Sequence, residues 1–282
     1  MKKQIETAYS NLNEHKYDAL IRKIAWRRRL VIALLIVVIL AIIAFCSPVQ
    51  IVVMGTMLVD HPGLHPALTV LLILLCSFIG LVAYAIVLLP LTNSLDVECD
   101  PEKHLMLNVM LNKTGNIDHI YAVDYFALGD YRRALEYANK MIKTKREDMI
   151  LAGLFNKARC EFMLGEGEAL RQTAEAYSCA LMGARNLKGK TLTAYQGIRD
   201  VVELMCALSE ENVERIRSLA DSVAPWGPSK ANECFIDYLK GVAACKTDDI
   251  VEVIYRFKTI KEKCPKTVFA RLAERELERL TN

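Results

Sequence analysis

The chain has 282 residues, 53% of them hydrophobic, and a formal net charge of +3. This length accommodates a membrane-embedded segment and one helical domain of about 190 residues. The positive charge comes from residues 1–29, with eight Lys and Arg against three Asp and Glu, whereas residues 93–282 are close to neutral. No nucleic acid partner is expected, because the large domain has no net positive charge.

The first expected element is a basic cytosolic tail over residues 1–29, which ends in Trp26, Arg27, Arg28 and Arg29. An aromatic residue followed by cations is typical of the edge of a membrane helix, so these four residues are predicted to lie at the membrane interface. Lys and Arg collect on the cytoplasmic side, and the N-terminus is therefore expected inside the cell. An anionic cytoplasmic leaflet would attract such a tail.

Two apolar runs follow the tail, at about 30–53 and 66–91. From Leu30 to Leu91 the only formally charged residue is Asp60, in the turn between the runs. About 20 helical residues cross a hydrocarbon core of roughly 30 Å. The pattern predicts a transmembrane hairpin over residues 30–92, in a multi-pass protein of the plasma membrane with both termini in the cytoplasm.

A cleaved signal peptide is the alternative interpretation of the first run. The 29 residues before it are too long for an ordinary n-region, and no A-x-A-like site follows. The segment Ile43–Cys46 loosely resembles a lipoprotein cleavage site, but Phe45 stands where a small residue is needed. An uncleaved anchor is therefore expected. Cys76, Gly80 and Ala83 are small residues in the second run, where they would let two helices approach closely.

The remaining sequence predicts helices. Asp100, Pro101 and Glu102 form a typical helix start, with an N-cap, a proline at the first helical position and an acid in the first turn. This start lies in an expected connecting helix over residues 93–115. Helical periodicity continues to the C-terminus without an alternating strand pattern, so the fold class expected is all-α.

The segment from Ala122 to Ala138 resembles a tetratricopeptide repeat (TPR), a family whose unit is two antiparallel helices in 34 residues. Ala122 and Tyr125 occupy first-helix contact positions, and Gly129-Asp130-Tyr131 occupies the turn. Ala134 and Ala138 follow on the second helix. Small residues at these positions let the paired helices close up.

A second match to the repeat lies near the C-terminus. It places Gly241 in the first helix, Asp248-Asp249-Ile250 at the turn, Val253, Phe257 and Ile260 in the second helix, and Pro265 at the end. Two degenerate units lie between the matches, one at Ala158 with Gly165 and one at Ala207–Ser209 before Val213. The resemblance covers roughly 116–265 and implies a superhelix of helical hairpins over residues 116–282, with a capping helix at Lys266–Leu280.

The resemblance also implies a docking surface for a protein or peptide, lined by the first helices of the repeats. Carried over by position, the partner-binding residues are His119, Val123, Phe126, Phe155, Arg159, Arg199 and Tyr238. Some members of the family clamp a terminal carboxylate with Lys and Asn. His119 and Val123 stand at those positions here, so a clamp of that kind is not expected.

Catalytic and metal-binding patterns are weak. Leu187–Thr191 resembles the end of a phosphate loop, but Ala184 replaces the required glycine and no strand precedes it. His61 and His65 beside Asp60 are a possible metal pair in the turn, although Pro62-Gly63 already explains that turn. His15, His104 and His119 are far apart in sequence and show no zinc-type spacing. No cofactor is expected.

The nine cysteines include no C-x-x-C pair and do not look like a disulfide framework, so free thiols in a reducing cytosol are expected. The resulting hypothesis is a membrane-anchored scaffold or adaptor that docks a protein partner near the lipid bilayer, and not an enzyme. Two alternatives stay open at this stage. One is an enzyme or enzyme subunit on a helical-hairpin scaffold, and the other is a structural protein that forms homo-oligomers through the hairpin.

Overall fold

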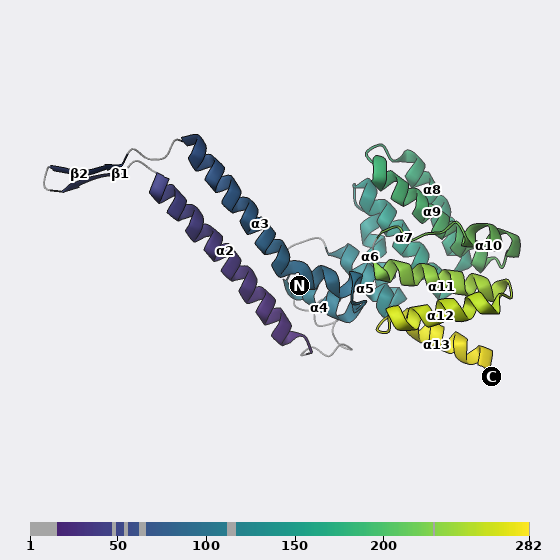
Figure 1. Ribbon diagram of the computed structural model, residues 1–282. Helices are drawn as coiled ribbons and strands as arrows, with labels where there is room; N and C mark the ends of the chain where they lie inside the picture. Colours follow the sequence, from purple (N-terminus) through teal and green to yellow (C-terminus); the bar gives the residue numbers. More distant parts are fainter. Residues whose placement is uncertain are drawn as a thin grey trace. The chain divides into compact units, whose positions relative to one another are not determined.

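The computed structural model describes residues 16–46, 49–53, 56–61, 66–111, 117–227 and 229–281 (Figure 1). The chain divides into two compact units, one over residues 13–90 and one from Leu91 onward. Helices dominate both units, so the predicted helical class is confirmed at that level.

The first unit contains α2 (Asp18–Cys46), β1 (Val49–Val53), β2 (Thr56–His61) and most of α3 (Pro66–Asp96). The two strands pair antiparallel, with Val49 opposite His61. The prediction that the first apolar helix runs on to Val53 is wrong, because these last residues form a strand. Val49–Val53 contains three valines and one isoleucine, whose branched side chains favour extended backbone.

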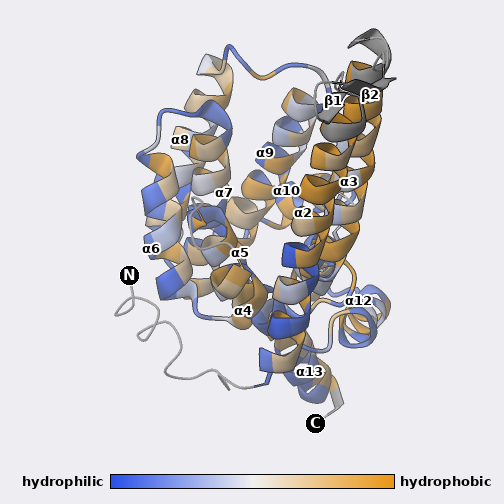
Figure 2. Cartoon of the chain, turned by 90° about the vertical axis from the view of Figure 1, so that its left-hand side faces the viewer, coloured by the Kyte–Doolittle hydropathy of each residue, from blue (hydrophilic) through white to orange (hydrophobic). Residues whose placement is uncertain are grey.

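Within the described residues, one helical segment is long and apolar enough to cross a membrane: Val70–Asp96, with a mean hydropathy of 2.9. The helix continues beyond Pro90, so the exit predicted near residue 91 is extended to Asp96. In α2 the apolar stretch from Leu30 to Cys46 is shorter, about 25 Å at 1.5 Å per residue. Figure 2 shows hydrophobic colouring along much of both helices.

The helices α2 and α3 approach each other at Gly80. A Cβ atom added at Gly80 would lie 2.6 Å from Cδ1 of Leu35, so a larger residue there would push the Leu35 side chain away. Many apolar side chains of both helices face outward, including Leu34, Val37, Phe78 and Leu81. Such a surface is stable in lipid and costly in water.

The second unit is a succession of helices, coloured from blue through yellow in Figure 1. Their bounds are α4 Pro101–Leu111, α5 Asp118–Leu128, α6 Tyr131–Ile142, α7 Glu147–Leu164, α8 Gly167–Gly183, α9 Gly189–Ser209, α10 Val213–Ala220, α11 Lys230–Lys246, α12 Ile250–Lys263 and α13 Val268–Thr281. The connecting helix expected over residues 93–115 is instead divided between the end of α3 and α4.

Local chemistry explains where several of these helices begin and end. The Asp100 carboxylate accepts a hydrogen bond from the Lys103 amide at 3.0 Å, which caps α4 as predicted. Gly129 closes α5 with a φ of 91°, and Asp130 then caps α6 by accepting from the Arg133 amide. Asp249 caps α12 in the same way, through the Glu252 amide.

Consecutive helices pack as hairpins, and alternate helices also contact one another: α5 with α7, α7 with α9, α9 with α11, and α11 with α13. The hairpin contacts need small residues. A Cβ atom on Gly241 of α11 would lie 2.5 Å from the Phe257 ring of α12, and Ala122, Ala134 and Ala138 are fully buried. In addition, α13 contacts α5.

Candidate functional site

Three of the residues predicted to line a docking groove converge in the interior of the helical-hairpin unit. Phe126 on α5, and Phe155 and Arg159 on α7, are all buried. The Phe126 ring lies 5.4 Å from the Phe235 ring on α11 and 5.6 Å from the Phe269 ring on α13. The Arg159 guanidinium carbon lies 5.5 Å from the centre of the same Phe235 ring, and the Phe155 ring lies 4.7 Å from the Trp226 ring in the loop before α11. Later segments of the chain therefore cover all three residues, and they lie in a core.

Arg159 is the unusual member of this core. Its guanidinium carbon lies 4.2 Å from the centre of the Phe126 ring and 4.7 Å from that of Phe155, and it donates a hydrogen bond to the Asn156 side chain. Among the described residues it forms no ion pair, and its Nε has no hydrogen-bond partner. Burial lowers the pKa of Arg159 to about 10. Contact with aromatic faces compensates part of the cost of desolvating the cation.

The other predicted groove residues do not join this cluster in the same way. Tyr238 is half-buried, and its ring lies 5.5 Å from that of Phe269 and 6.3 Å from that of Phe257. Val123 is half-buried on α5, and His119 is exposed near the start of that helix. The seven predicted residues therefore do not form one continuous open surface.

Arg199 is exposed and lines a groove of about 660 Å³ between α8 and α9. Met182 lies in the same groove with 80% of its surface exposed, and Leu181 and Leu192 add apolar lining. The Arg199 guanidinium lies 3.2 Å from the carboxylate of Asp200, its neighbour in sequence. The groove thus combines apolar contact area with an exposed cation, and both are accessible.

A buried ionic contact between α4 and α5 was missed by the sequence analysis, which found no pairing for His104. Its Nδ1 lies 2.8 Å from both carboxylate oxygens of Asp124, and Asp124 is fully buried. Burial raises the pKa of Asp124 to about 6, although His104 opposes the shift. Burial lowers the pKa of His104, but the hydrogen bond and charge of Asp124 outweigh it and the net shift is upward.

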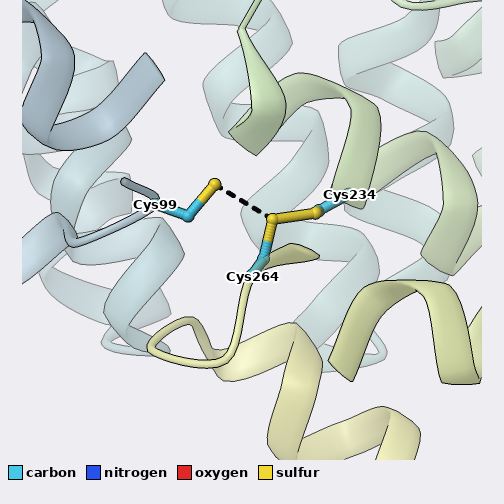
Figure 3. A group of neighbouring side chains, drawn as sticks. All are labelled: Cys99, Cys234 and Cys264. Carbon is cyan, nitrogen blue, oxygen red and sulfur yellow. Dashed lines mark hydrogen bonds between the residues drawn. A yellow bond between two sulfur atoms is a disulfide. The ribbon is translucent and has the colours of Figure 1, made fainter. Parts of the chain in front are cut away.

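The structure corrects the prediction that the cysteines of this unit are all free thiols. Cys234 and Cys264 form a disulfide, and Cys99 lies beside them (Figure 3). Over the ranges that the structure describes, these three residues are also the only group of three or more His, Cys, Asp or Glu whose ligand atoms converge closely enough for a metal ion. Two of the three sulfurs would have to be reduced before they could bind one.

The remaining candidates are the histidines near the turn and the loop near Leu187. Asp60 and His61 belong to β2, where side chains are not described, and His15 and His65 lie outside the described residues. Near Leu187, the amides of Arg185 and Asn186 donate to the Glu147 carboxylate at 3.1 and 2.9 Å. The amides of this loop therefore bind a carboxylate of the same chain, although its sequence resembles the end of a phosphate-binding loop.

The predicted membrane-interface residues lie on one continuous helix. Trp26, Arg27 and Arg29 are exposed, and Arg28 is half-buried. All four belong to α2, directly before its apolar stretch. The basic tail from Asp18 onward and the first apolar run therefore belong to a single helix.

No family model, curated protein or solved structure matches the chain. The resemblance to tetratricopeptide repeats consequently rests on the residues quoted above.

Proposed function

We propose that this protein is a membrane-anchored adaptor whose helical-hairpin unit docks a protein partner in the α8–α9 groove. The observation that carries the proposal is the exposure of Met182 beside the exposed cation Arg199 in a groove of about 660 Å³. Methionine adapts its shape to apolar side chains, and arginine supplies directional hydrogen bonds. The partner segment would place an apolar side chain on Met182 and a carboxylate or carbonyl near Arg199.

The anchor in this proposal is a hairpin of α2 and α3. Support comes from the outward-facing apolar side chains of both helices, from their close approach at Gly80, and from the Trp26–Arg29 flank. A stretch of about 25 Å in α2 is accommodated by local thinning of the bilayer or by cationic side chains that extend to the interface. Two crossings would leave both termini on the cytoplasmic side.

The repeat assignment is part of the same proposal. Support comes from the helix turns at Gly129-Asp130 and at Asp249, and from the close approach of Gly241 on α11 to Phe257 on α12. A helical repeat presents a preformed surface, so little ordering is needed when a partner binds. The membrane anchor would raise the local concentration of partners in the same membrane.

The side of the membrane is open to a direct test. The basic tail favours the cytoplasm, whereas a stable disulfide is typical of oxidising compartments. Cys179 and Cys245 are exposed free thiols and report the location of the unit. With a membrane-impermeant maleimide, we expect labelling of these residues only after permeabilisation, and none in a Cys179→Ser, Cys245→Ser control. Labelling in intact cells would place the unit outside.

Docking is tested by a photo-crosslinking amino acid at position 182 of the full-length protein in its own membrane. We expect one defined crosslinked species. Arg199→Glu should reduce its yield at least about tenfold, because the new carboxylate would repel a carboxylate of the partner across a partly desolvated contact. Val251 on α12 is equally exposed, at 80%, and serves as the matched control position. Equal crosslinking at positions 182 and 251, or no effect of Arg199→Glu, would contradict docking in the groove.

A further inference from the structure

Three cysteines from distant parts of the chain meet in the helical-hairpin unit. Cys99 lies between α3 and α4, Cys234 lies in α11, and Cys264 follows the last residue of α12. All three are fully buried, and their sulfurs lie within 4.8 Å of one another. Residues 99 and 264 are 165 positions apart in sequence, so the fold alone brings them together.

The three sulfurs are not equivalent. Cys234 and Cys264 share the disulfide, and the Cys99 thiol lies 3.0 Å from Sγ of Cys264. In Figure 3 the Cys264 sulfur lies between the other two, and the Cys99 side chain points toward it. A thiol that approaches one sulfur of a disulfide from the side away from the other is placed for exchange, because the leaving sulfur departs opposite the attacking one.

Surrounding contacts hold this arrangement. The Lys266 ammonium lies 2.6 Å from the carboxylate of Asp100, the residue after Cys99, and this ion pair joins the two loops that carry Cys99 and Cys264. Lys263 and Glu233, each next to one of the bonded cysteines, lie 3.7 Å apart. Cys99 itself has a φ of 48°, a conformation that residues other than glycine rarely adopt. The cluster is thus supported on each of the segments that supply a sulfur.

We propose that Cys99, Cys234 and Cys264 form an internal thiol–disulfide exchange site. The Cys99 thiol loses its proton, and the resulting thiolate attacks Sγ of Cys264. A Cys99–Cys264 bond forms while the Cys234–Cys264 bond breaks, and Cys234 leaves as a thiolate that takes up a proton. One disulfide and one thiol are present before and after the step, so the three sulfurs undergo no net oxidation or reduction. The exchange therefore requires no external oxidant or reductant.

The exchange changes which segments are covalently joined. The Cys234–Cys264 bond links α11 to the end of α12, two helices that already form one hairpin. The Cys99–Cys264 bond would instead link the segment directly after α3 to the C-terminal hairpin. The proposal is independent of docking at the α8–α9 groove, since none of the three cysteines lines that groove.

Burial of Cys99 makes the proposed exchange slow at neutral pH, because it keeps the thiol protonated. It raises the pKa of Cys99 to about 11; the charge of Lys230 opposes the shift, and those of Glu233 and Asp96 add to it. The attacking species is the thiolate, so its fraction rises about tenfold per pH unit below that value. Exchange is therefore expected to be faster in alkaline buffer.

The test incubates the full-length protein in detergent at pH 9 without added thiol or disulfide, and the Cys234→Ser variant with oxidised glutathione. All samples are then quenched in acid and alkylated. Mass spectrometry of unreduced peptides then identifies the linkages. In the unsubstituted protein we expect both the 234–264 and the 99–264 linkage. Cys234→Ser should carry the 99–264 linkage as its main disulfide, and Cys99→Ser should carry 234–264 alone. Cys206→Ser, which removes another buried free cysteine, should match the unsubstituted protein.

Two outcomes would overturn the proposal. One is a protein in which Cys99 is always alkylated, both in Cys234→Ser and in the unsubstituted chain at pH 9. The other is stoichiometric zinc in the isolated protein with all three cysteines reduced, which would make the cluster a metal site. The measurement on the unsubstituted chain keeps the test decisive if Cys234→Ser does not fold.

Discussion

Helix α3 and the core of the helical-hairpin unit are built from the same apolar residue types but expose them oppositely. Leu81 of α3 has 65% of its surface exposed, whereas Leu204 of α9 has none. The hairpin unit buries its apolar side chains between its own helices, so its core requires no apolar surroundings. The outward-facing side chains of α3 are costly in water, and the helix is long and apolar enough to cross a bilayer. The same residue types thus form a self-covered core in one region and an exposed apolar surface in the other.

The largest expected effect tests whether Phe126 belongs to a core or to an open groove. Phe126→Ala should destabilise the hairpin unit by about 3–5 kcal/mol, because it leaves a cavity among buried aromatic rings. Thermal unfolding in detergent measures the change. Phe78→Ala in α3, where the ring is 63% exposed, is the matched control and should leave that transition unmoved. An unchanged unfolding temperature for Phe126→Ala would show that Phe126 lines an open groove and is not part of a core.

A charge in α3 tests the other half of the comparison. Leu81→Arg should raise the free energy of membrane insertion by about 2.5–3.5 kcal/mol, the cost of arginine at the centre of a membrane helix. Glycosylation acceptor sites placed on either side of α3 in the full chain report the inserted fraction. Val251→Arg introduces the same charge at an exposed apolar position of α12 and should not alter insertion. An equal inserted fraction for Leu81→Arg and the unsubstituted protein would contradict the prediction that α3 crosses the membrane.

A smaller effect is expected where helices of one hairpin meet. Gly241→Ala should destabilise the unit by about 1–3 kcal/mol, since the added methyl group overlaps the Phe257 ring. Gly197→Ala in α9 meets no atom within 4 Å and should stabilise the unit by about 0.5–1 kcal/mol through helix propensity. Chemical denaturation compares the two. Stabilisation by Gly241→Ala of the same size as that by Gly197→Ala would show that α11 and α12 are not in close contact at Gly241.

The smallest effect concerns the pH dependence of the His104–Asp124 contact. The pKa values of both groups are raised in the folded protein, so folding favours their protonated forms. Stability from Asp124 should be lost as pH rises from 3.8 through about 6, and stability from His104 as pH rises above 6.5. The double variant His104→Gln, Asp124→Asn should flatten this decline between pH 5 and 8. A parallel decline in both proteins would assign it to other groups.

Several features followed from the sequence because neighbouring residues determine them. The starts of α4, α6 and α12 depend on aspartates that bond amides three positions onward. The end of α5 depends on the left-handed backbone of Gly129. The apolar run of α3 is likewise a property of consecutive residues. Each of these interactions spans a few positions, so a pattern in the sequence predicts it.

The sequence by itself therefore determined the helical class, the apolar helix and a few helix boundaries, namely the starts of α4, α6 and α12 and the end of α5. Only the tertiary structure decided that Phe126 is covered by α11 and α13, that Arg159 lies over Phe235, and that Cys99 meets Cys234 and Cys264. It also decided that Val49–Val53 pairs as a strand instead of extending α2. Contacts between residues more than a hundred positions apart depend on how the helices pack, and hydrophobic periodicity specifies that a face is buried without specifying its partner.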